Sequence, residues 1–149
     1  EVGVIQSHIT WVKSISTEYW SYGHFKPVNS KRYLTNTHES VFIVSRDGNF
    51  TLDRLAVGVP FKDKSNIGRF KSNQSDLRCR GNVWYVPYKT RNTSVNHPAT
   101  YPVELAEMMI KIVGTPGKIL DPFMGTGTTR LASQNLNVEA DGIDLKEWV

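Results

Sequence analysis

Alternating apolar and polar residues predict two strands in the first third of the chain. Residues 3–13 alternate well enough for a strand. Residues 39–45 are mostly β-branched, aromatic or otherwise apolar, and the turn-forming residues 46–49 follow them. We therefore expect the two stretches to pair as antiparallel strands at one edge of a sheet.

A different pattern after residue 96 predicts helices alternating with strands. Pro102 fits the first turn of a helix that runs to about Val113. Residues 118–120 form a short apolar strand, residues 126–136 fit a second helix, and residues 138–145 fit a second parallel strand. This order is typical of half of a doubly wound α/β sheet. The apolar stripe of the first helix is expected at Leu105, Met108, Met109 and Ile112.

The turn between the first of these strands and its helix is suited to hold a ligand. Gly125 and Gly127 have no Cβ and can take positive φ, and the amides that open the next helix are unpaired donors. A P-loop needs a Lys after its last Gly, and a dinucleotide fingerprint needs a small residue where Arg130 stands, so neither fits. Asp144, at the end of the next strand, can accept hydrogen bonds from ribose hydroxyls. The pattern indicates a nucleoside ligand without phosphates.

The middle of the chain is basic and irregular. Residues 46–91 hold ten Lys and Arg against four Asp, a net charge of +6, whereas the whole chain carries +4. We predict loops with short strands there, contacts with nucleic-acid phosphates, and mostly structural roles for its aromatic residues. Residues 13–38 mix aromatic and basic residues, and form either a surface near nucleic acid or a solvated loop whose aromatics cap the core. The candidate contacts to nucleic acid are Lys62, Lys64, Arg69, Arg78 and Arg80.

Two motifs together resemble those of one enzyme family. The run from Asp121 to Thr129, preceded by the run from Asn96 to Leu105, closely resembles the β-type amino-methylating DNA methyltransferases. The resemblance implies an incomplete Rossmann-like α/β sheet with a loop-rich basic insert. It divides the chain into three parts: the edge strands of the catalytic half (1–45), a target-recognition insert (46–95) that would bind DNA, and the half that binds the cofactor (96–149). It also implies S-adenosylmethionine as cofactor, bound by His97, Pro98, Thr100, Asp121, Phe123, Gly125, Gly127, Thr128 and Asp144.

The catalytic loop of that family is absent from this sequence. The family places an acidic, amide or hydroxyl residue before Pro-Pro-aromatic, and no Pro-Pro occurs here. We therefore assign no catalytic residue and expect a C-terminal fragment that lacks the two central strands. Such a chain should be poorly stable and inactive without the missing N-terminal half. The implied substrate is double-stranded DNA, at adenine N6 or cytosine N4, and a cognate restriction endonuclease is a further implied partner.

Composition narrows the class of protein without deciding its function. Hydrophobic residues make up 39% of the chain, and no apolar run is long enough to cross a bilayer, so we expect a cytoplasmic protein without a membrane partner. Cys79 is the single cysteine, which excludes an internal disulfide and a cysteine-based zinc site, and we expect it to be at least half-buried. No metal site is predicted. The alternatives are a non-catalytic DNA-binding module and, disfavoured by the basic insert, a methyltransferase for RNA or protein.

Overall fold

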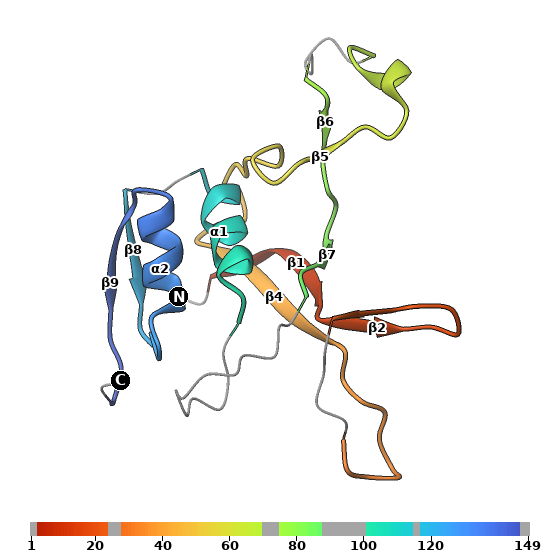
Figure 1. The fold of residues 1–149 in the computed structure, drawn as a ribbon. Coiled ribbons are helices and arrows are strands. Elements are labelled where there is room, and N and C mark those ends of the chain that lie inside the picture. Colours follow the sequence, from red (N-terminus) through yellow and green to blue (C-terminus); the bar gives the residue numbers. More distant parts are fainter. Residues whose placement is uncertain (1–2, 24–27, 70–74, 88–100, 115–116, 147–149) are drawn as a thin grey trace.

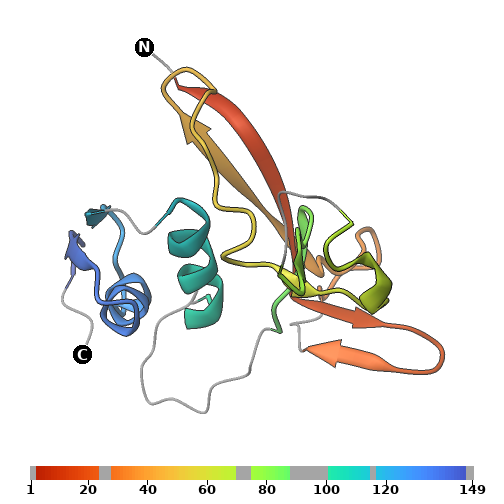
Figure 2. The ribbon, with the colours of Figure 1, turned by 90° about the horizontal axis from the view of Figure 1, so that it is seen from above.

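The computed structural model describes residues 3–23, 28–69, 75–87, 101–114 and 117–146. Helix α1 (Val103–Ile112) lies between a three-stranded sheet on one side and a two-stranded parallel pair with its own helix on the other (Figures 1 and 2). A short hairpin and the middle of the chain project from the three-stranded sheet, away from the parallel pair. No helix in the part of the chain that the structure describes is long and apolar enough to span a membrane.

The three-stranded sheet confirms the antiparallel pair predicted near the start of the chain. Strand β1 (Val4–Val12) pairs antiparallel with β4 (His38–Ser45), and a bulge interrupts the register between Ile5 and Ser7. Strand β7 (Val83–Tyr85) pairs parallel with the other edge of β1, which gives the order β4-β1-β7. Among the described strands, β4 therefore has one edge without a partner strand.

The segments between these strands contain only short strands, which were predicted for the middle of the chain but not for residues 13–38. Strands β2 (Ser14–Ser16) and β3 (Ser21–Gly23) form a hairpin, and β5 (Val59–Pro60) pairs with β6 (Leu77–Arg78) around the single-turn helix η1 (Lys64–Asn66). The expected structural role of the aromatic residues holds for Trp84, which is fully buried. Phe50 and Tyr85 are about half exposed, and Phe70 and Tyr88 lie outside the described residues.

The C-terminal segment has the predicted strand, helix and strand. Strand β8 (Lys118–Asp121) pairs parallel with β9 (Glu139–Gly142), and helix α2 (Thr128–Asn135) connects them. The parallel pairing needs a crossover connection, which α2 supplies. Strand β8 pairs only with β9 among the described strands, so its other edge is open as well.

Helix α1 is buried on two sides, although the sequence predicted one apolar stripe. Leu105, Met108 and Ile112 of that stripe pack into the larger core under the three-stranded sheet, and Met109 lies against it. The opposite side of the helix contributes Ala106 and Ile110 to a second core. The rest of the larger core consists of Ile9, Trp11, Ile43, Val57, Trp84 and Val86, and the second core is completed by Ala132 and Val138.

Cys79 is exposed, so the expectation that it would be at least half-buried was wrong. It follows the two-residue strand β6, at a place where the chain has left one short ladder and has not yet joined β7. Such a short pair of strands has no core beneath it in which a thiol could be buried.

Candidate cofactor site and nucleic-acid surface

The turn after β8 has the conformation that its glycines allow. Gly125 has φ +51° and Gly127 has φ +83°, and Gly127 stands immediately before α2 in the left-handed region. The amide of Met124 donates to the carbonyl of Ile143 at 3.0 Å, which ties the turn to the end of β9. A Cβ placed on Gly127 would meet no atom nearer than 3.9 Å, on Arg130. The space over this glycine is therefore open, and a ligand can approach the backbone there.

The Asp144 carboxylate lies against the same turn. Its Oδ2 accepts a hydrogen bond from the amide of Gly125 at 2.7 Å, and its Oδ1 accepts one from the amide of Lys146 at 3.2 Å. Asp144 is exposed, and an ionised carboxylate has about four lone-pair sites. It can therefore accept hydrogen bonds from ligand hydroxyl groups while it holds the turn. The carboxyl ends of β8 and β9 bring these groups together from positions 19 residues apart.

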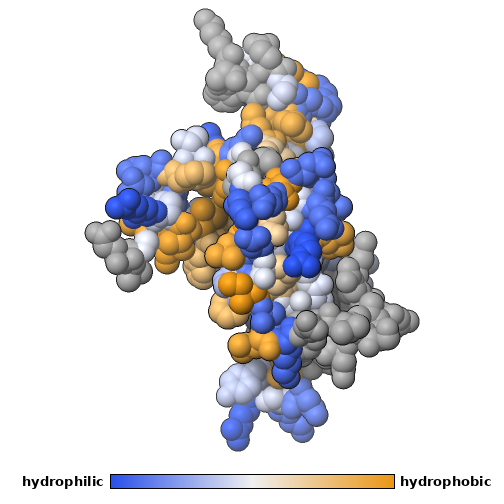
Figure 3. Space-filling model, turned by 90° about the vertical axis from the view of Figure 1, so that its left-hand side faces the viewer, coloured by the Kyte–Doolittle hydropathy of each residue, from blue (hydrophilic) through white to orange (hydrophobic). Residues whose placement is uncertain are grey.

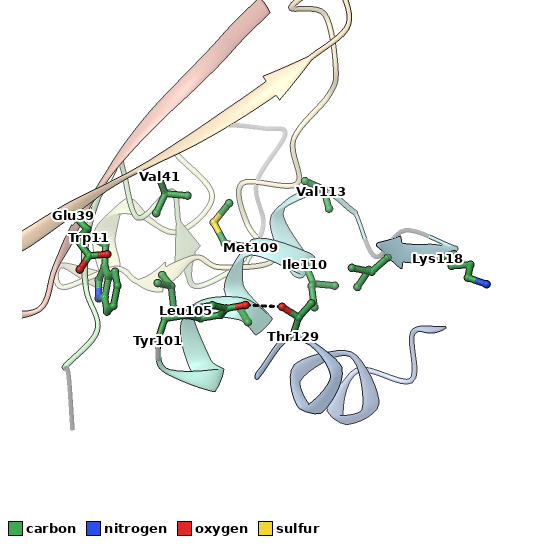
Figure 4. Close-up of a pocket in the computed structure, with 12 residues that line it drawn as sticks. Trp11, Glu39, Val41, Tyr101, Leu105, Met109, Ile110, Val113, Lys118 and Thr129 are labelled. Carbon is green, nitrogen blue, oxygen red and sulfur yellow. Dashed lines mark hydrogen bonds between the residues drawn. The ribbon is translucent and has the colours of Figure 1, made fainter. Parts of the chain in front are cut away.

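A second set of contacts, which we call the hydroxyl network, consists of Tyr101, Thr129 and Asp121. The Thr129 hydroxyl donates to Asp121 Oδ2 and lies 2.5 Å from the hydroxyl of Tyr101 (Figure 4). Asp121 Oδ1 accepts from the amide of Phe123 at 3.0 Å. Burial raises the pKa of Tyr101 and the Asp121 charge raises it further, against the opposite effect of the Thr129 hydrogen bond. The network connects the start of α1 to both ends of the glycine turn.

Sequence reasoning placed Asp121 in the site but missed Tyr101 and Thr129. The signal that could have found Thr129 was its position next to Thr128 in the first turn of α2, one residue beyond the predicted set. Thr128 itself is buried, and the ring of Phe123 is 86% exposed. Predicted residues His97, Pro98 and Thr100 lie outside the described residues. Asp121, Gly125, Gly127, Thr128 and Asp144 surround one turn.

A cavity that shares Tyr101 and Thr129 with the hydroxyl network, the inter-sheet groove, runs between β4 and β8 with α1 as its floor (Figures 3 and 4). Its volume is about 590 Å³, and Glu39 stands at one end and Lys118 at the other. Lys118 forms ion pairs of 2.9 Å with Glu139 and with Asp141, whose hydrogen bonds raise its pKa. The lining of the groove is mostly apolar. The groove is lined by Trp11, Glu39, Val41, Tyr101, Leu105, Ala106, Met109, Ile110, Val113, Lys118, Ile119 and Thr129.

Four of the five predicted DNA contacts present their side chains to solvent. Lys62, Arg69 and Arg78 are exposed, and Lys64 is exposed but pairs with Asp76 at 2.5 Å. Surface ion pairs contribute at most about 1 kcal/mol, so a phosphate can compete for Lys64. Arg80 is half-buried, and its Nε donates to the carbonyl of Val57 at 2.9 Å. Arg80 thus links two segments of the insert, and only part of its guanidinium group is left to contact a ligand.

A model of the DNA methylase family, N6_N4_Mtase, matches residues 2–148. The chain belongs to this family. The match confirms the resemblance that the two motifs indicated. Among curated relatives, the type II methyltransferase M.SmaI of Serratia marcescens is 29% identical over 86% of this chain and 40% of its own length. The type II methyltransferase M.ScaI of Streptomyces caespitosus is 30% identical over 94% of this chain and 50% of its own length.

Solved structures confirm the incomplete Rossmann-like α/β fold. The M1.HpyAVI–SAM complex matches with a TM-score of 0.56 and 25% identity, over 97% of this chain and 57% of that one. The PvuII DNA methyltransferase, described as cytosine-N4-specific, matches with a TM-score of 0.66 over 97% of this chain and 48% of its own, and at 17% identity it supports the fold alone. The chain spans about half the length of the relatives that it matches.

Proposed function

We propose that this chain forms the recognition and cofactor-binding part of a site-specific DNA methyltransferase. The enzyme would transfer a methyl group from S-adenosylmethionine to adenine N6 or cytosine N4 in double-stranded DNA. The observation that carries the proposal is the contact between Asp144 and Gly125, because it joins a carboxylate to an open glycine turn at the ends of two parallel strands. Membership of the DNA methylase family supports it.

The residues around the turn fit an adenosyl group without phosphates. Asp144 would accept hydrogen bonds from the ribose hydroxyls, and the open backbone at Gly127 would let the ligand lie close to the chain. No Lys or Arg of the turn itself offers a charge to a phosphate, since Arg130 follows on α2. We further propose, from the family resemblance, that Phe123 contacts the adenosyl group and that His97, Pro98 and Thr100 lie beside the methionine end.

S-adenosylmethionine, when bound, supplies a methyl group that is attached to a positively charged sulfur. The sulfur keeps the bonding electrons when the methyl group is transferred. The attacking amine needs acceptors that hold its hydrogens and receive the proton it loses. The part of the chain that the structure describes offers no such loop beside the turn, in keeping with the absence of Pro-Pro from the sequence. We propose that the N-terminal half of the enzyme supplies it.

The inter-sheet groove supports the proposal that the N-terminal half of the enzyme supplies the catalytic loop. The open edges of β4 and β8 lie on its two sides, and its apolar floor on α1 is the kind of surface that side chains of central strands would cover. Two further strands between these edges would join the three-stranded sheet and the parallel pair into one sheet. In a bacterial restriction–modification setting such an enzyme would work in the cytoplasm beside a cognate restriction endonuclease.

Cofactor binding tests the first part of the proposal. We expect calorimetric titration of the chain with S-adenosylmethionine to show binding that Asp144→Asn weakens about tenfold, which corresponds to about 1.4 kcal/mol. Asp141→Asn is the matched control, because Asp141 lies on β9, three residues before Asp144, and pairs with Lys118 instead of the turn. Equal affinity of both variants for the cofactor would contradict the assigned role of Asp144.

Methyl transfer tests the second part. We expect no transfer to duplex DNA by the chain alone and measurable transfer when it is co-expressed with the coding region upstream of it. Digestion of the product to nucleosides would distinguish N6-methyladenine from N4-methylcytosine. Transfer by the chain alone would refute the proposed division of labour. DNA binding without any affinity for the cofactor would instead support a non-catalytic DNA-binding module.

A further inference from the structure

The β2–β3 hairpin exposes two aromatic rings at its tip. Tyr19 is 88% exposed and Trp20 is 55% exposed, in the turn between Ser16 and Ser21. The sequence left open whether aromatic residues of this region cap the core, and these two do not. Trp and Tyr are the residues that most often dominate the binding energy of an interface when a partner covers them. Both rings are therefore available to a partner.

The tip is held in one conformation. The amide of Thr17 donates to the carbonyl of Trp20 at 2.8 Å, and the amide of Trp20 donates to the Thr17 hydroxyl at 3.1 Å. Gly23, at the other end of the hairpin, has φ +69°, and a Cβ there would lie 2.0 Å from the carbonyl oxygen of Lys13. The two rings are thus presented by an ordered arm, which lowers the entropic cost of binding.

The arm contacts β7, a strand within the basic insert. The Tyr22 hydroxyl donates to the carbonyl of Tyr85 at 3.0 Å, and the two rings meet edge to face with centroids 6.3 Å apart. Tyr85 ends β7, a strand that lies within the insert. Figures 1 and 2 both show the hairpin on the side of the molecule that carries the insert, opposite β8 and β9. The hairpin and the insert therefore lie on the same side of the molecule.

We propose that the hairpin tip, Tyr19 and Trp20, contacts double-stranded DNA next to the basic insert. This inference rests on the proposed function and adds a contact surface to it. The insert provides the charge that attracts phosphates, with ten basic against four acidic residues between positions 46 and 91. The rings provide the uncharged part of the contact, against sugars and base edges. Glu18, beside the rings, keeps the tip itself from acting as a phosphate site.

Trp20 gives a direct optical test. Trp11 and Trp84 are 3% and 0% exposed, so Trp20 is the solvent-accessible tryptophan of the described residues, and Trp148→Phe removes the fourth. We expect duplex DNA to change the fluorescence of the Trp148→Phe chain and to protect it from acrylamide. Unchanged acrylamide quenching at saturating DNA would overturn the proposal. Protection of Trp20 before DNA is added would also overturn it, because another part of the protein would then cover the tip.

Binding measurements separate this inference from the proposed function. We expect Tyr19→Ala and Trp20→Ala to weaken duplex binding about fivefold or more, because each change removes a ring that the bound duplex would cover. The dependence of affinity on salt should stay as in the unaltered chain, because no phosphate contact is lost. Trp20→Phe should retain most of the affinity, and Tyr33→Ala, which removes a ring that is 72% exposed in another loop, should have no effect.

The outcomes are distinct. Wild-type affinity in both alanine variants overturns the role of the tip and leaves the proposed function standing. Failure of the unaltered chain to bind duplex DNA at low salt removes the DNA-binding part of the proposed function, and the inference falls with it. The fluorescence measurement needs no change in the hairpin, so it decides the question even if an alanine variant does not fold.

Discussion

The hydroxyl network at the glycine turn yields a prediction that can be worked out bond by bond. Tyr101→Phe removes one contact between neutral hydroxyls, 2.5 Å long. Such a bond contributes about 0.5–1.5 kcal/mol, whereas a bond to a charged group contributes about 1.5–3 kcal/mol. Thr129→Val removes both the Tyr101 contact and the bond to Asp121. The free energy of unfolding should therefore fall by about 1 kcal/mol in the first variant and by about 2–4 kcal/mol in the second.

The double variant separates a network from two independent contacts. Once Thr129 is Val, the Tyr101 hydroxyl has lost this partner, so Tyr101→Phe should cost little more. The double variant should then be about as stable as Thr129→Val alone, which gives a coupling energy of about 1 kcal/mol. Urea unfolding of the four forms, followed by circular dichroism, measures it. Additive losses of stability would refute the network.

The same variants test whether the network positions the cofactor turn. Thr129→Val frees the Asp121 carboxylate, which holds the amide of Phe123 in the turn. We expect the affinity for S-adenosylmethionine to fall about tenfold, equivalent to about 1.4 kcal/mol, and Thr129→Ser to retain it. Tyr22→Phe is the matched control, because it removes one tyrosine hydrogen bond far from the turn. A loss of stability with unchanged cofactor affinity would leave the network a structural role only.

Two further predictions concern stability. Burial raises the pKa of Tyr101. The stability that the protonated Tyr101 hydroxyl contributes is therefore complete below the ordinary tyrosine pKa of about 10 and is lost as the pH rises through the raised pKa. Urea unfolding at alkaline pH should accordingly show a smaller loss of stability in Tyr101→Phe than in the unaltered chain. Trp84→Ala removes a fully buried ring and an indole hydrogen bond, and should lower the free energy of unfolding by about 3–5 kcal/mol, whereas a loss below about 1 kcal/mol would show that the ring is not in the core.

Much of the fold could be predicted because its elements have clear periodicity. Strands β1, β4, β8 and β9 and both helices lie where the apolar pattern placed them, to within a few residues at each end. The meeting of Asp144 with the glycine turn was also predictable, because adjacent parallel strands bring their carboxyl ends to one edge. The order of the two strands and the position of Asp144 after the second strand were sufficient to predict that part of the site.

The parts that sequence did not reveal depend on packing between distant segments. Tyr101 and Thr129 are 28 residues apart, and their contact follows from the way α1 and α2 lie side by side. The burial of Ala106 and Ile110 follows from the same arrangement, because a helix that lies between two cores needs an apolar side toward each core. Pattern alone predicted only the stronger of its two apolar sides.

The position of α1 also explains why stability and activity should be regained together. The helix supports both sheets, yet among the described strands β4 and β8 each keep an open edge above it. Apolar side chains of these two strands stay exposed, with Leu120 at 64% and Phe42 at 53%. Exposed apolar strands with open edges favour aggregation. The strands that we propose to fill the inter-sheet groove would pair with these edges and cover its apolar lining at Val41 and Ile119, although Phe42 and Leu120 do not line the groove. Their carboxyl ends would lie beside that of β8, so the loops that follow them would reach the glycine turn. A partner segment that restores methyl transfer should therefore also raise the resistance of the chain to urea.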